Sequence, residues 1–502
     1  MNFFSKYFQT KFLIPVFVIL CAIYIYGLFG RIPDIDDAWI GEYAYWLAKD
    51  GYAHSELMRG INLQETKFVV HHKLFILHGA LFINLFGFSV YTLKLVTLLY
   101  FVFFIILFIY YTRKWKRLFN REDLWFSLIL IFSFPYIFKF SFIYRPEIMM
   151  MTYGFVGFIL LEKYLKLEGS KFWQLFLAGI FFGLTMATHL NGLILVVSAF
   201  LLILWNKRFL AVFGFGIAVL LAFSIYFFDI SSMADLELWQ HQFFDSPSLD
   251  SLVAGPKWLK PIVNLIEEHI RYFHNPKIIF FSIFILFTLG VGFNFLKQKH
   301  TNLLRFAFLV AFITGIVAMH KAVHYLLLNF PYFVILVTLT IKNLKEEKAD
   351  SWPFHSKEWK IGVRLTLSFL FILFLLVSTL YNIELAVKKF KVDKNQALAE
   401  KYIDVDKKTL NIVAPMTFIF NEIEHFKRIQ GDLCYYELQK LDPSIRGEGL
   451  LRKAETFDIS LMMISKYYFE PLGISEYEIH DTIGQFHVFD KNDELLVFKR
   501  LQ

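Results

Sequence analysis

The chain is 502 residues long, with 57% hydrophobic and 19% charged residues. A single water-soluble core of this length does not need that much apolar side chain, so the excess is predicted to face lipid. The formal net charge of +8 would suit a soluble nucleic-acid-binding protein. Here the lysines and arginines cluster in short loops between apolar runs, as they do in membrane proteins, where they set the orientation of the spans. The sequence therefore predicts no nucleic-acid partner.

About eleven apolar runs are long enough to cross a membrane as helices. A bilayer core about 30 Å thick needs about 20 apolar residues in a helix, and these runs are continuous rather than alternating, so spanning strands are not expected. The first run has no small-x-small cleavage site before Arg31 and is predicted to remain as a span. The predicted spans are 12–30, 89–112, 124–140, 146–165, 173–188, 191–205, 208–228, 277–296, 304–320, 322–341 and 361–384.

Basic residues indicate which ends of the spans face the cytoplasm. If the amino terminus lies inside, every inside loop carries lysine or arginine, whereas the short outside loops hold little beyond Arg145 and Lys321. This asymmetry predicts that residues 31–88, residues 229–276 and the carboxyl-terminal tail lie on the extracytoplasmic side. The basic inside loops include 113–121, 297–305 and 342–360.

The tail, residues 391–502, has the composition of a soluble domain. Its short apolar runs are predicted strands, and the stretches between them have helical patterns, which together indicate a small α/β domain that folds on its own. The fold class is therefore an all-α polytopic membrane domain, residues 1–390, followed by this soluble domain. The predicted strands are 410–414, 459–464, 486–489 and 495–498.

An acidic segment follows the first span directly. Asp36, Asp37 and Glu42 begin the polar face of a predicted helix and stand among the aromatic residues of DDAWIGEYAYW. Carboxylates at a membrane surface, framed by aromatic rings, are compatible with a polar pocket that carries out proton transfer. The alternative interpretation is a helix cap beside an interfacial aromatic belt.

Other polar groups are predicted on the same side of the membrane. Arg145-Pro146-Glu147 begins the fourth span, and an ionisable pair at the mouth of a span is a candidate site, although proline and glutamate also simply favour a helix start. The histidines suit metal binding by spacing, but no HExxH pattern accompanies them. The remaining candidates are His71, His72 and Lys73, then His189, and then His320, Lys321, His324 and Tyr325.

Taken in order, these pieces resemble the GT-C superfamily of integral membrane glycosyltransferases, in particular its protein O-mannosyltransferase and lipid A aminoarabinose transferase branch. Members carry an acidic pair after the first span, which Asp36 and Asp37 resemble, with Glu42 where a further acidic residue often stands. Arg145-Pro146-Glu147 resembles their Arg-Pro-Asp signature with glutamate in place of aspartate.

Three further segments are similar to family patterns. HHKLF at 71–75 resembles a His-Pro-Pro-Leu stretch but lacks both prolines, and GLTMATHLNG at 183–192 has His189 where relatives often carry lysine. HKAVHYLLLNFPYF at 320–333 resembles a basic-tyrosine-proline pattern. The order of these motifs matches the family over nearly the whole chain.

The resemblance implies an enzyme of a bacterial inner membrane that moves a sugar from a polyprenyl-phosphate donor to a lipid, glycan or protein acceptor on the extracytoplasmic side, with inversion. Asp36, Asp37 and Glu147 are the implied catalytic residues, with Asp36 as the base. The implied substrate-binding residues are Glu42, His71, His72, Lys73, Arg145, His189, His320, Lys321, His324 and Tyr325. We expect the tail to shape the acceptor entrance.

Metal use differs between branches of the family, so a divalent metal such as Mg²⁺ or Mn²⁺ stays open, with Asp36, Asp37 and Glu147 as candidate ligands. Two other function classes compete with the enzyme: a polytopic transporter or lipid flippase, and a nonenzymatic component of polymer assembly. Transporters usually place ionisable groups at mid-membrane and show repeated halves, whereas the candidates here stand at the mouths of spans and no repeat is visible.

Overall fold

The computed structural model describes residues 9–166, 171–244, 259–318, 321–346, 357–389, 393–403 and 405–501. These residues fall into two compact units. Unit 1 lies within Met1–Arg31, Thr97–Phe227 and Ala254–Lys389, and unit 2 lies within Ile32–Val96, Phe228–Val253 and Phe390–Gln502. One division between the units falls near residue 390, where the sequence predicts a domain boundary. Unit 2 also contains almost all of the predicted extracytoplasmic loop 31–88, whereas the loop predicted at 229–276 is divided between the two units.

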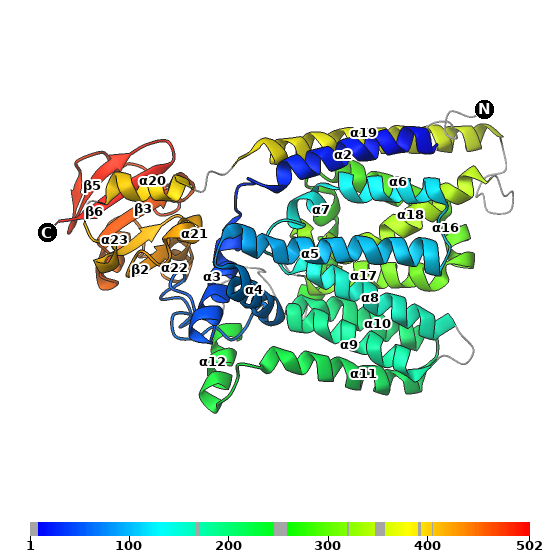
Figure 1. Ribbon diagram of the computed structural model, residues 1–502, viewed down its shortest axis with the longest axis horizontal. Helices are drawn as coiled ribbons and strands as arrows, with labels where there is room; N and C mark the ends of the chain where they lie inside the picture. Colours follow the sequence, from blue (N-terminus) through cyan, green and yellow to red (C-terminus); the bar gives the residue numbers. More distant parts are fainter. Residues whose placement is uncertain are drawn as a thin grey trace. The chain divides into compact units, whose positions relative to one another are not determined.

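Unit 1 is helical. Helix α9 packs between α8 and α11, and α2 packs along α19, as Figure 1 shows. Its elements are α2 (Thr10–Leu28), most of α5 (Val90–Ile109), the π-helical turn η1 (Tyr110–Trp115), α6 (Arg121–Ser133), α7 (Pro135–Phe140), α8 (Glu147–Lys166), α9 (Phe172–Thr188), η2 (Leu190–Gly192), α10 (Leu193–Trp205), α11 (Phe209–Phe223), η3 (Ser224–Phe227), α14 (Lys260–Ile266), α15 (Glu268–Phe273), α16 (Ile279–Lys299), α17 (Thr301–Val317), η5 (Val323–Leu328), α18 (Phe330–Lys345) and α19 (Lys357–Val387).

The apolar helices confirm an integral membrane protein. Six segments of the described chain are long and apolar enough to cross a bilayer: Thr10–Leu28, Val90–Trp115, Glu147–Lys166, Phe209–Phe227, Ile279–Lys299 and Glu358–Val387. Shorter apolar helices occupy Lys73–Phe86, Phe172–Thr188, Leu190–Trp205 and Thr301–Val317. Three of these four correspond to predicted spans, and Lys73–Phe86 is an apolar helix inside the segment predicted to be an extracytoplasmic loop.

Two predicted spans are interrupted where the sequence has proline. The span predicted at 124–140 divides into α6 and α7 at Pro135, which has no N–H to continue the helix and holds Phe134 in an extended conformation. The span predicted at 322–341 begins as the 3₁₀ segment η5, and α18 starts only at Phe330 with Pro331 in its first turn. Both breaks lie near the polar residues described below.

Unit 2 combines helices with one sheet. The helices and turns are α3 (Ile35–Asp50), α4 (Lys73–Phe86), α12 (Met233–Phe244), α20 (Asp393–Tyr402), η7 (Lys407–Thr409), η8 (Met416–Phe418), α21 (Ile419–Glu422), α22 (Asp432–Leu441), α23 (Glu448–Thr456) and η9 (Lys466–Tyr468). The strands are β1 (Asn411–Ala414), β2 (Arg428–Gly431), β3 (Leu461–Ser465), β4 (Thr482–Ile483), β5 (Phe486–Lys491) and β6 (Leu495–Arg500). The predicted small α/β tail is therefore confirmed.

The sheet has the order β2-β1-β3-β6-β5-β4. Strand β1 pairs in parallel with β2 and β3, while β6 is antiparallel to both β3 and β5. The four predicted strands correspond to β1, β3, β5 and β6. β2 and β4 were not predicted, because β2 contains charged and polar residues and β4 has two residues.

The loop after α3 packs against the tail within unit 2. The N–H of Gly431, at the end of β2, donates to the Leu57 carbonyl at 2.9 Å, and Gln430 Nε2 donates to the Arg59 carbonyl at the same distance. The ring of Phe457 lies so close to Gly60 that a Cβ there would be 2.7 Å from it. The tail thus shares its packing with residues from the amino-terminal third of the chain.

Candidate active site

The acidic pair lies at the amino-terminal end of α3. Asp34 caps the helix, and the Asp37 carboxylate accepts the Asp34 N–H at 2.8 Å, which completes a capping box. Asp37 is fully buried, whereas Asp36 is only partly buried. Of the two carboxylates, Asp37 therefore has a structural function in the cap, and Asp36 is the one with surface available to a substrate.

Lys94 forms an ion pair with Asp37, their charged atoms lying 3.4 Å apart. Both side chains are buried, at 1% and 0% exposure, so the two charges compensate each other where water cannot. Lys94 is not among the site residues predicted from the sequence. The sequence does mark Lys94 in one way: it is the single lysine inside the apolar run 89–112. A charge in such a run is a functional candidate.

Glu42 is buried further along α3 than the acidic pair. Its carboxylate accepts hydrogen bonds from Ser55 Oγ, from Trp46 Nε1 at 3.0 Å, and from the N–H groups of Glu56 and Leu57 at 2.8 and 3.1 Å. Burial raises the pKa of Glu42 to about 7, although these hydrogen bonds favour the charged form. The contacts make Glu42 the anchor of the following loop, and its assignment to substrate binding stays a prediction.

The lysines before and at the start of α4 are also held by acidic partners within unit 2. Lys73 is buried and forms an ion pair with Asp229, and Lys67 Nζ lies 2.7 Å from an Asp235 carboxylate oxygen. His72 is the residue before the helix and has a left-handed backbone, with φ of 58°. Asp229 was missed by the sequence analysis, although it directly follows the apolar run 208–228.

In unit 1, Arg145 and Glu147 form an ion pair at the start of α8. Arg145 Nη2 donates to Glu147 Oε1 at 2.8 Å, and its Nε donates to Oε2 at 3.1 Å. His324, from η5, lies beside both, with its Nε2 at 3.6 Å from Glu147 Oε1 and 3.4 Å from Arg145 Nη2. Residues 179 positions apart in the sequence thus meet.

The turn after α9 joins this cluster. His189 Nδ1 accepts the Asn191 N–H at 2.9 Å, and Asn191 Nδ2 donates to the Tyr325 hydroxyl at 2.5 Å. Burial lowers the pKa of His189 to about 4, so the ring is neutral near pH 7. Tyr325 is therefore oriented by a neutral hydrogen-bonded turn.

A second basic group in unit 1 forms around Glu268. Arg271 Nε donates to Glu268 at 2.6 Å, and Lys321 Nζ lies 3.3 Å from the other carboxylate oxygen and donates to the Asn264 carbonyl at 2.5 Å. The Arg271 guanidinium lies 5.4 Å from the centroid of the Tyr325 ring. Arg271 and Glu268 were not predicted, because nothing in the sequence distinguishes them from other charges of the 229–276 segment. His320 lies outside the described residues.

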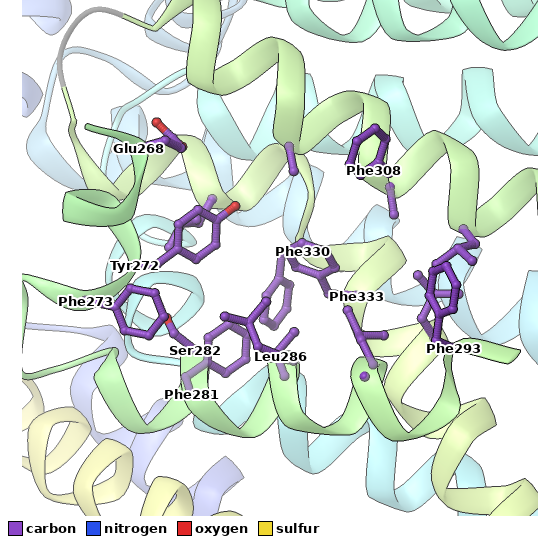
Figure 2. A pocket seen from close by; sticks show the side chains of 18 residues that line it. Glu268, Tyr272, Phe273, Phe281, Ser282, Leu286, Phe293, Phe308, Phe330 and Phe333 are labelled. Carbon is purple, nitrogen blue, oxygen red and sulfur yellow. The ribbon is translucent and has the colours of Figure 1, made fainter. Parts of the chain in front are cut away.

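An apolar cavity of about 620 Å³ begins at Glu268. Figure 2 shows Glu268 and Tyr272 at one end and the rings of Phe293 and Phe308 farther along. Phe293 and Phe308 are 50% and 58% exposed, so in a membrane they would lie against lipid. The carboxylate that binds Arg271 and Lys321 therefore also lines a cavity suited to hydrocarbon.

The donor set of these clusters does not fit a metal ion well. Among the described residues, no three His, Cys, Asp or Glu side chains gather as metal ligands would. Asp37 is already held by Lys94, and Glu147 by Arg145. The proposed use of Asp36, Asp37 and Glu147 as ligands of Mg²⁺ or Mn²⁺ stays a prediction.

No protein-family model matches the chain, and no curated protein sequence matches it. Solved structures do match. ArnT from Cupriavidus metallidurans, bound to undecaprenyl phosphate, has 11% identity, a TM-score of 0.57 and coverage of 98% of each chain. The oligosaccharyltransferase AglB from Archaeoglobus fulgidus, in complex with an inhibitory peptide and a dolichol-phosphate, has 11% identity, a TM-score of 0.52 and coverage of 93% of this chain and 70% of that one.

A third structure, an oligosaccharyltransferase from Archaeoglobus fulgidus tethered to an acceptor peptide with an NVT sequon, has 11% identity, a TM-score of 0.54 and coverage of 99% of this chain and 75% of that one. At identities this low, the structural likeness establishes that the chains share a fold. Two of the neighbours that share this fold were solved with a lipid phosphate, ArnT with undecaprenyl phosphate and AglB with a dolichol-phosphate.

Proposed function

We propose that this GT-C-fold protein is a glycosyltransferase that takes its sugar from a polyprenyl-phosphate donor. The observation that carries the proposal is the apolar cavity at Glu268, because the Glu268 carboxylate at its end also pairs with Arg271 and Lys321. A polyprenyl phosphate has the same two parts, an anionic head and a long hydrocarbon chain. The complexes of the structural neighbours with undecaprenyl phosphate and dolichol-phosphate support this assignment.

The cations of unit 1 would stabilise the leaving phosphate. As the bond from the anomeric carbon to the phosphate oxygen breaks, negative charge develops on that oxygen, and preorganised donors lower the barrier at this point. Arg145, Lys321 and Arg271 supply the positive charge, while His324 and Tyr325 supply further hydrogen-bonding groups. Glu147 holds the Arg145 guanidinium in a fixed orientation.

Asp36 is the base in this proposal. It would take the proton from the acceptor hydroxyl as the acceptor oxygen bonds to the anomeric carbon and the polyprenyl phosphate leaves. A single displacement of this kind inverts the anomeric configuration. Its partial exposure supports Asp36 over the buried Asp37, which would position the helix through its cap and Lys94. The acceptor would be a lipid, a glycan or a protein on the extracytoplasmic face of a bacterial inner membrane.

The binding of the donor's hydrocarbon chain can be tested by filling the cavity. Gly290 lines it, and a Cβ added there would meet no atom within 4 Å; Gly216 on α11 is equally open but does not line it. Gly290→Leu should raise the KM for long polyprenyl donors about tenfold, since one or two lost apolar contacts are worth roughly 1–3 kcal/mol. Gly216→Leu should leave KM unchanged.

The assay uses purified protein with a panel of polyprenyl-phosphate sugars and follows release of the lipid phosphate. Equal KM values for the two leucine variants would remove the cavity from donor binding. Movement of intact lipid-linked sugar across a vesicle membrane, without release of lipid phosphate, would favour the alternative of a transporter or flippase.

A further inference from the structure

A second cavity lies in unit 1 at the other end of its helices. It has a volume of about 750 Å³ and is lined by the turn after η1, the end of α16, His300 between α16 and α17, and the end of α18. Helix α8 has 20 residues between Glu147 and Lys166, so its two ends lie about 30 Å apart. Lys116, next to the cavity residue Arg117, pairs with Glu162 near the far end of α8. The cavity is thus distinct from the Arg145–Glu147 cluster.

The lining combines charge with apolar surface. Its cationic side chains are Arg117, Lys299 and Lys342, and its anionic one is Glu346. Gln298, His300 and Asn343 add hydrogen-bonding groups, and Leu118, Phe295 and Leu339 add apolar surface. Burial lowers the pKa of His300 to about 4, which leaves the ring neutral at pH 7.

The backbone presents Arg117 to this cavity at a conformational cost. Helix α5 ends in the π-helical turn η1, and Arg117 follows it with φ of 51°, a left-handed conformation that a side chain with a Cβ rarely adopts. Lys342 Nζ donates to the Leu118 carbonyl at 2.6 Å and so holds the turn in place. Such strain is found most often at functional positions.

Two cations remain available to a ligand. Arg117 and Lys299 are exposed, and neither forms an ion pair with any residue that the structure describes, whereas nearby Glu162 is already paired with Lys116 and Lys166. Helix α16 has 21 residues and is long enough to cross the bilayer core, so Lys299 at its end lies at the depth of lipid headgroups.

We propose that this cavity binds the phosphate-bearing headgroup of an anionic phospholipid, with Arg117 and Lys299 on the phosphate and the apolar wall against the first carbons of the acyl chains. Basic pockets between membrane helices recognise anionic headgroups through this combination of charge and apolar surface. The site is independent of the proposed transferase chemistry, because it shares no residue with it.

The test measures the thermal midpoint of the full-length protein in neutral detergent as phosphatidylglycerol, phosphatidylcholine or inorganic phosphate is added. Phosphatidylglycerol should raise the midpoint by roughly 3 °C in a saturable manner, as a ligand of the folded state does, and phosphatidylcholine should not. The double variant Arg117→Gln/Lys299→Gln should lose this rise.

The matched control is Arg113→Gln/Lys114→Gln, which removes two exposed charges from the adjacent η1 turn without touching the cavity. This variant should keep the rise. Equal loss in both variants would show diffuse surface attraction and overturn the proposal, as would an unchanged rise in the Arg117/Lys299 variant. An equal rise with inorganic phosphate alone would overturn the assignment to a lipid.

Discussion

Some charged residues of this protein stabilise the structure, and others have surface that a substrate can reach. Asp36 and Asp37 are adjacent in sequence, but Asp37 is buried, completes the capping box of α3 and pairs with Lys94, while Asp36 keeps part of its surface exposed. The Glu42 carboxylate likewise accepts hydrogen bonds from four groups, three of them in the following loop. Three carboxylates that look equivalent in the sequence therefore have different positions and different expected effects on mutation.

Asp36→Asn should abolish sugar transfer and leave the fold intact. Asparagine keeps the size and most of the hydrogen bonding of aspartate but cannot take the proton, so kcat should fall by about 10² or more. Release of the lipid phosphate from a polyprenyl-phosphate sugar provides the measurement, with the thermal midpoint as the control for folding.

Asp37→Asn is the companion variant. Because it leaves Lys94 buried without its charged partner, it should lower the thermal midpoint more than Asp36→Asn does. Full turnover by both single variants and by the double variant would exclude the acidic pair from the mechanism.

At the scale of elements, α9 and α11 approach each other through glycine. Gly179 and Gly183 are four residues apart on α9, and a Cβ on either would lie within 2.7 Å of a backbone carbonyl oxygen of α11, that of Phe215 or Val219. Small residues at this spacing let membrane helices pack backbone to backbone. His189 and Asn191 follow α9 directly, in the turn that orients Tyr325.

Gly183→Val should destabilise the protein by about 3 kcal/mol, because the added side chain meets the Val219 carbonyl, which cannot move without shifting α11. The measurement is the thermal midpoint in detergent. Gly216→Val, on α11 where a Cβ meets no atom within 4 Å, should change the midpoint little. If the two valine variants have the same thermal midpoint, the packing of α9 against α11 does not depend on the glycine contact.

For the whole molecule, the distribution of basic residues predicts which side of the membrane each segment faces. The positive-inside rule places the amino terminus in the cytoplasm and, after an odd number of spans, the tail outside. The proposed acceptor lies on the extracytoplasmic face, and this orientation places both Asp36 and the tail on that face.

A reporter fused at Gln502 should therefore show an extracytoplasmic location, and one fused after Lys207, in a predicted inside loop, should show a cytoplasmic location. Activity of a reporter that works only outside the cytoplasm, set against one that works only inside, distinguishes the two fusions. A cytoplasmic signal at Gln502 would contradict the orientation.

The sequence by itself determined the membrane class, most of the apolar helices and four strands of the tail. Each of these depends on local properties: the length of an apolar run, the alternation of side chains, or a proline that ends a helix. The resemblance to the GT-C superfamily also came from local motifs, and the fold that the chain shares with ArnT agrees with it. The candidate residues Arg145, Glu147, His189, Lys321, His324 and Tyr325 were found in the same way.

Only the tertiary structure decided which partner each charge has. Lys94 with Asp37, Asp229 with Lys73, and Lys321 with Glu268 are pairs that no local pattern predicts, because their members lie far apart in the sequence and the choice depends on how the helices pack. The same is true of the cavity at Glu268. Burial and pairing, rather than residue type, determine which charges stay available to a substrate, and both arise only once the chain has packed.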